Sequence, residues 1–166
     1  GIFDSGVGGL SVWRELIKVI PGNRMIYVSD NAFSPYGPRP QSEIISRAMS
    51  ITDFLIKNGA GIIVIACNTA TAAAIEELRW KYEIPFVGME PAVKPAAKMS
   101  KTKVIGVLAT KGTFMGRLYN KTLRRFATGL RVVEKVGTGL VDIVENGKAD
   151  TPESKKLLSK YITPMI

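Results

Sequence analysis

The feature that most constrains the fold is an alternation of short apolar runs with longer helical patterns along the whole chain. The apolar runs predict strands over residues 1–3, 25–28, 61–66, 85–88, 104–108 and 130–134. The segments between and after them predict helices over residues 9–19, 41–58, 69–81, 91–100, 113–127, 140–146 and 152–161. Such alternation is typical of βα units that build a parallel sheet. The predicted fold class is therefore α/β, with doubly wound parallel sheets.

A polar, lysine-rich stretch at residues 100–103 separates a predicted helix from a new apolar run. We place a domain boundary there, so that residues 1–100 form a first α/β domain and residues 101–166 begin a second, truncated one. With 166 residues, 46% of them hydrophobic, the chain can bury a sizeable core. No apolar run approaches the roughly 18 residues that a membrane-spanning helix needs, and we expect no membrane partner.

The chain contains no histidine, which excludes several kinds of catalytic site. Without an imidazole it cannot by itself supply a Ser-His-Asp triad, a Cys-His dyad or a His-containing zinc site. Proton transfer must then use carboxylates, Lys, Tyr or the single thiol, Cys67. One cysteine also excludes an internal disulfide, which fits a reducing compartment, and we expect a cytoplasmic protein.

The net charge of +9 favours an anionic partner, whether a dicarboxylate, a phosphate or a nucleic acid. The cations are scattered, however, over residues 94–103 and 117–125 at the spacing of solvated helix faces. Because no nucleic-acid-binding motif accompanies them, we expect no nucleic-acid partner.

Ligands of doubly wound folds bind beyond the carboxyl ends of the strands, and Asp4 and Ser5 follow the first predicted strand. They open a glycine-rich turn over residues 4–9, whose backbone amides would favour an anion at a helix start. The turn is not a full dinucleotide fingerprint, since Ser11 stands at the position of the third glycine. A turn that only caps the next helix is the alternative interpretation.

Cys67 directly follows the third predicted strand and lies at the start of an alanine-rich helix. A helix N-terminus favours the thiolate, so this position predicts a lowered pKa and a reactive thiol. The alternative is an inert core cysteine, because cysteine is among the most buried residue types. Asn68 and Thr69 can donate hydrogen bonds to a ligand carboxylate beside the thiol, which favours the reactive interpretation.

Other candidate site residues also follow predicted strands or lie on short helices. The proline-rich stretch 34–40, with Pro35, Tyr36 and Gly37, predicts a rigid loop over the sheet edge. Thr110 and Thr113 could bind an anion or cap the next helix. Asp142 and Glu145, three residues apart on a predicted helix, could face one cleft or form a solvated pair.

Three of these segments together, FDSGVGGL at 3–10, PYGP at 35–38 and ACNTA at 66–70, resemble the glutamate racemase family in order and spacing. The resemblance continues through residues 88–92, 106–110 and 140–145 and covers essentially the whole chain. It implies a two-domain racemase fold with a cleft between the domains. It also implies a homodimer that interconverts L- and D-glutamate with two thiols, without metal or pyridoxal cofactor, and supplies D-glutamate for bacterial peptidoglycan.

The resemblance also implies roles for individual residues. Cys67 matches the thiol that acts on the D-enantiomer, Asp4 assists its proton transfer, and Glu145 matches a carboxylate near the second thiol. The residues implied to line the substrate site are Ser5, Pro35, Tyr36, Gly37, Asn68, Thr69, Thr110 and Thr113.

The family carries its second thiol and a histidine in a Gly-Cys-Thr-His segment that these 166 residues do not contain. We therefore expect the chain to be an inactive N-terminal portion of a longer racemase. One alternative is a single-thiol racemase or decarboxylase of the same superfamily that acts on another carboxylate. Another is a non-catalytic module that binds carboxylates.

Overall fold

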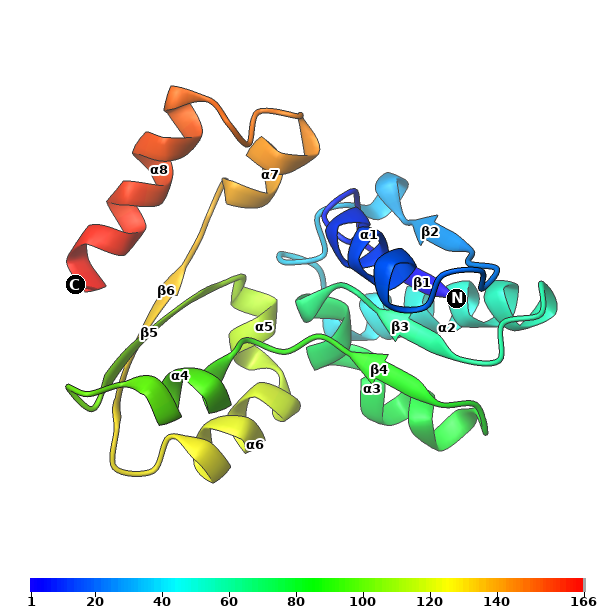
Figure 1. Ribbon diagram of the computed structural model, residues 1–166, viewed down its shortest axis with the longest axis horizontal. Helices are drawn as coiled ribbons and strands as arrows, with labels where there is room; N and C mark the ends of the chain where they lie inside the picture. The colour runs from blue at the N-terminus through cyan, green and yellow to red at the C-terminus, as the bar shows by residue number, and fades with distance from the viewer. Residues whose placement is uncertain (166) are drawn as a thin grey trace.

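A four-stranded parallel sheet forms the first half of the protein in a computed structural model that describes residues 1–165 (Figure 1). The strands lie in the order β2-β1-β3-β4. Because β1 lies inside the sheet, the chain winds outward from it in both directions, as a doubly wound fold requires. The strands are β1 (Ile2–Asp4), β2 (Tyr27–Ser29), β3 (Ile63–Ile65) and β4 (Phe86–Gly88). The helices of this unit are α1 (Leu10–Val19), η1 (Asn31–Phe33), α2 (Gln41–Lys57) and α3 (Asn68–Lys81).

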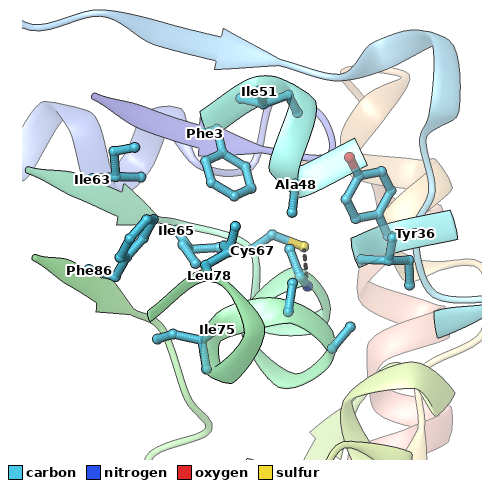
Figure 2. Close-up of a cluster of buried hydrophobic side chains, with 14 of the residues drawn as sticks. Phe3, Tyr36, Ala48, Ile51, Ile63, Ile65, Cys67, Ile75, Leu78 and Phe86 are labelled. Carbon is cyan, nitrogen blue, oxygen red and sulfur yellow. Dashed lines mark hydrogen bonds between the residues drawn. The ribbon is translucent and has the colours of Figure 1, made fainter. Parts of the chain in front are cut away.

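The main core lies between this sheet and the helices α2 and α3 (Figure 2). Helix α2 buries Ile44, Ala48, Ile51 and Leu55, whose spacing follows the helical period and leaves the opposite face to solvent. They pack with apolar side chains from one face of the strands, among them Phe3, and with the alanine-rich face of α3. The same core reaches Cys67 at the carboxyl end of β3.

The second unit contains two parallel strands, β5 (Val104–Ala109) and β6 (Arg131–Val136). Its core includes Val93, Ile105, Val107 and Tyr119. Helix α4 thus packs with this core, although it precedes the predicted boundary at residue 100. Helices α4 and α6 lie on one side of the strand pair and α8 on the other (Figure 1). The helices are α4 (Val93–Met99), α5 (Lys111–Met115), α6 (Arg117–Phe126), α7 (Leu140–Glu145), α8 (Pro152–Ile162) and η2 (Thr163–Met165).

Every predicted strand and helix except one lies within two residues of its observed bounds, as for residues 25–28 against Tyr27–Ser29. The exception is the predicted helix over 113–127, which is wrong: α5 and α6 are separated by Gly116 in an extended conformation. At Gly116 the chain lies so close to α3 that a Cβ atom would come within 2.4 Å of Ala72 Cβ. Among the helices of residues 1–165, none is both long enough and apolar enough to span a membrane.

Candidate functional site

A cavity of about 490 Å³ lies at the carboxyl ends of β1 and β3, facing the start of α5 and helix α7. Of the candidate site residues that the sequence analysis named, it collects all but Asp142, which does not line it, and they come from both units of the fold. These residues are Asp4, Ser5, Pro35, Tyr36, Gly37, Cys67, Asn68, Thr69, Thr110, Thr113 and Glu145. The structure thus brings all of them together, while the role of each stays a prediction.

Asp4 holds the glycine-rich turn through its own side chain. Its Oδ2 atom accepts hydrogen bonds from the backbone N–H of Gly6 at 3.2 Å and of Gly9 at 3.0 Å, and the carboxylate is buried. The amides that were expected to favour a bound anion are therefore occupied by a carboxylate of the chain itself. The turn positions Asp4 and Ser5 at the cavity.

Glu145 reaches the same turn from α7. Both of its carboxylate oxygens lie 3.1 Å from the backbone N–H of Val7, which donates to them. Gly6 permits this approach, since a Cβ atom there would lie 2.0 Å from Glu145 Oε1. Glu145 thereby joins the second unit to the loop after β1, and its predicted place near a second thiol stays a prediction.

Cys67 is the N-cap residue of α3, and its sulfur accepts a hydrogen bond from the Ala70 N–H at 3.3 Å. The sulfur also lies 3.7 Å from Ser5 Oγ, and the residue is 8% exposed. Burial raises the pKa of the thiol to about 11, and the charge of Asp4 adds to this rise. The hydrogen bonds of the thiol with Ala70 and Ser5 offset the rise only in part. The predicted lowering of the pKa is therefore wrong, because desolvation outweighs the helix N-terminus.

We expect the reactivity of Cys67 to increase with pH by about tenfold per unit, because only the thiolate reacts. The increase should continue toward the thiol's pKa of about 11. The raised pKa also makes the free energy of unfolding depend on pH, because the folded protein favours the protonated thiol. The contribution of this group to the free energy of unfolding is complete below the ordinary pKa of 9.0 and is lost as the pH rises above about 11. Alkylation by iodoacetamide, followed by mass spectrometry of the Cys67 peptide, measures the profile. A plateau below pH 9 would contradict it.

The variant Asp4→Asn is the matched comparison for that profile. Asparagine keeps an oxygen that can accept from Gly9 but removes the negative charge that raises the pKa of Cys67. The alkylation profile should therefore move to lower pH, and an unchanged profile would show that burial alone raises the pKa.

Three threonine hydroxyls join α3 to the start of α5 at the cavity wall. Thr69 Oγ1 lies 2.7 Å from Thr110 Oγ1, which in turn lies 3.0 Å from Thr113 Oγ1. Thr110 also accepts a hydrogen bond from the Thr113 N–H at 3.3 Å and so caps α5. Capping was one of the two interpretations that the sequence allowed for this residue. Because the hydroxyls line the cavity as well, capping and ligand binding are compatible here.

The first turn of α3 presents backbone donors beside the thiol. The first N–H groups of a helix have no acceptor within the helix. The Ala70 N–H is bound to Cys67 Sγ, whereas the N–H groups of Asn68 and Thr69 have no acceptor among residues 1–165. Both residues line the cavity, so these amides can bind a carboxylate held over Cys67.

Sequence reasoning missed part of the cavity wall. The additional lining residues are mostly apolar and come from ends of strands and from helices: Gly8, Ser11, Val12, Ala66, Met89, Pro91, Leu108, Ala109, Leu140, Val141 and Val144. Most of them lie within the segments that resemble the racemase family, at or near the ends of predicted strands or on a predicted helix, and these were the signals available. Sequence reasoning also assigned no role to Asp30, which does not line the cavity but accepts a hydrogen bond from the hydroxyl of Tyr36.

Residues 10–166 match the family model described as Asp/Glu/Hydantoin racemase. The chain belongs to this family. Among its members, the glutamate racemase of Roseiflexus sp. (strain RS-1) is 45% identical, with an alignment covering 100% of this chain and 61% of the relative. The glutamate racemase of Ectopseudomonas mendocina is 46% identical, over 100% of this chain and 64% of the relative. The chain thus spans somewhat over three fifths of the length of these racemases.

Solved glutamate racemase structures have the same fold. The Escherichia coli enzyme in complex with L-glutamate and the activator UDP-MurNAc-ala aligns with a TM-score of 0.87 and 33% identity, over 98% of this chain and 62% of that one. Isoform RacE1 from Bacillus anthracis aligns with a TM-score of 0.85 and 35% identity, over 99% of this chain and 62% of that one. The enzyme from Francisella tularensis in complex with D-glutamate aligns with a TM-score of 0.83 and 26% identity, over 99% of this chain and 62% of that one. The predicted racemase resemblance and α/β fold class are confirmed.

Proposed function

We propose that the whole protein interconverts L- and D-glutamate without a cofactor, with Cys67 as one of two thiols that transfer the α-proton. The observation that carries this proposal is the position of Cys67 in the cavity, beside unoccupied amides and threonine hydroxyls, in a chain of the racemase family. The glutamate bound in the Escherichia coli and Francisella tularensis structures supports glutamate as the substrate. Such a protein supplies D-glutamate for peptidoglycan, and we propose that it works in the cytoplasm as a homodimer.

The cavity provides what removal of an α-proton requires. The α-proton of an amino acid is weakly acidic, so the base must be held at contact distance and the developing negative charge must be stabilised. The amides of Asn68 and Thr69 and the hydroxyl of Thr110 can bind the substrate carboxylate that gains this charge. A second proton-transferring group on the opposite face of the carbon then explains inversion.

The raised pKa of Cys67 has a consequence for this reaction. At neutral pH the Cys67 thiol is protonated, since burial and Asp4 raise its pKa to about 11. The ammonium group of a bound amino acid adds a positive charge to the cavity, and this charge favours the thiolate. In this proposal, substrate binding itself brings the thiol toward its basic form.

Deuterium incorporation at the α-carbon tests the proposed function. The full-length protein in D₂O should exchange the α-proton of both glutamate enantiomers, and exchange of aspartate should be slower by about a hundredfold. Exchange of another carboxylate in preference to glutamate would favour a single-thiol racemase or decarboxylase. Binding of D-glutamate by calorimetry without any exchange would identify a non-catalytic binding module.

A further inference from the structure

A polar network joins Tyr36 of the cavity wall to Asp30 and to Arg47 of helix α2. The Tyr36 hydroxyl donates to Asp30 Oδ2 at 2.6 Å, and the ring is 1% exposed. Arg47 of α2 donates to the same carboxylate through Nε at 2.9 Å and through Nη2 at 2.7 Å. This bidentate geometry is the strong form of a carboxylate–guanidinium pair.

Arg47 is itself fixed by aromatic contact. Its guanidinium carbon lies 4.0 Å from the centre of the Phe33 ring, within the range of a cation–π contact. Asp30 is 6% exposed, so its charge is buried and needs these partners. Burial alone would raise the pKa of Asp30, but the hydrogen bonds from Arg47 and Tyr36 outweigh it and lower the pKa.

The network constrains a loop that has little regular structure of its own. Residues 34–40 form no helix or strand, and their amides make few backbone hydrogen bonds, such as Arg39 N–H to Tyr36 O at 3.1 Å. The loop nevertheless supplies Pro35, Tyr36 and Gly37 to the cavity wall. Tyr36 belongs to the same core cluster as Cys67, whose sulfur lies on the side of the cluster that Tyr36 occupies (Figure 2).

We propose that Asp30 and Arg47 are positioning residues that hold the Tyr36 ring, and with it the cavity wall of residues 35–37, beside Cys67. Neither of their side chains lines the cavity, so the two side chains act through Tyr36, while the backbone N–H of Asp30 donates to Asp4 O at 3.0 Å whatever the side chain. The effect on catalysis rests on the proposed racemase function, whereas the effect on shielding of the thiol does not.

The substitution Asp30→Asn breaks the network with little change in size. Asparagine has one oxygen and an NH₂ group, so it cannot accept both bonds of the Arg47 guanidinium and that of the Tyr36 hydroxyl. Tyr36→Phe removes only the hydroxyl and leaves the Asp30–Arg47 pair in place. Asp53→Asn is the matched control, because exposed Asp53 also accepts a tyrosine hydroxyl, that of Tyr82, at 2.6 Å, and neither residue lines the cavity.

In the full-length protein, Asp30→Asn and Tyr36→Phe should each raise KM for glutamate by about five- to tenfold, as expected for loss of about one hydrogen bond. The kcat value should change by no more than about twofold, and Asp53→Asn should leave both constants within about twofold. A merely structural role would lower the active fraction and hence kcat, with KM unchanged. The double variant should be no worse than the more severe single one, because both changes act through the same contact.

Alkylation of Cys67 by iodoacetamide provides a readout that does not depend on activity. Both substitutions should accelerate it by about fivefold through loss of shielding by the ring, whereas Asp53→Asn should not. If the unmodified protein exchanges no glutamate, the proposed function fails and the alkylation rates alone decide the positioning role. Unchanged KM and unchanged alkylation in both variants, or strictly additive effects in the double variant, would overturn the proposal.

Discussion

Replacing Cys67 with serine is expected to reduce α-proton exchange of glutamate in the full-length protein by about a thousandfold. Serine keeps an atom that can accept the Ala70 N–H, so the N-cap of α3 is retained. A serine hydroxyl is a far weaker acid than a thiol, so its anion is not available as a base at neutral pH. Deuterium incorporation from D₂O into each enantiomer measures the loss.

The alanine variant of the same residue separates catalysis from folding. Cys67→Ala removes both the thiol and the cap, and loss of a cap costs about 1 kcal/mol. Exchange should therefore be lost in both variants, whereas the unfolding temperature should fall clearly only for alanine. More than a tenth of the original exchange rate in the serine variant would show that Cys67 does not transfer the proton.

Much of the site could be predicted because its residues occupy positions that local sequence determines. Cys67 lies where an apolar run gives way to an alanine-rich helical pattern, and Asp4 lies at the corresponding place after the first strand. Parallel strands bring such positions to one edge of a sheet, whatever their separation along the chain. The helical spacing of Ile44, Ala48 and Ile51 likewise determined which face of α2 is buried.

The remainder depends on contacts between elements that no local pattern records. The break at Gly116 follows from the close approach of α3, and the Asp30–Arg47 pair forms only once α2 lies against the residue that follows β2. The pKa of Cys67 was mispredicted for the same reason. The helix N-terminus is a local feature of the sequence. The desolvation that outweighs it comes from residues of several elements that pack around Cys67.

The largest expected effect on stability belongs to Gly9, where α1 meets the sheet. A Cβ atom at Gly9 would lie 2.7 Å from Asp4 Cβ, 2.8 Å from Ala66 Cβ and 2.8 Å from the Tyr27 hydroxyl. The backbone angles, φ −65° and ψ −12°, are open to any residue, so the cost of alanine here is steric. We expect Gly9→Ala to reduce the free energy of unfolding by about 3 kcal/mol.

Gly61→Ala is the control for that substitution, because a Cβ atom at Gly61 would meet nothing within 4 Å. It should change the free energy of unfolding by less than about 1 kcal/mol, with a gain possible through the unfolded chain. Urea unfolding of both variants measures the difference.

Because the atoms that crowd Gly9 include the Asp4 side chain, Gly9→Ala should also accelerate Cys67 alkylation by displacing the turn that holds Ser5. Equal stability of the two variants would mean that α1 can move away from the sheet without loss, and that the glycine-rich turn is not what fixes Asp4 at the cavity.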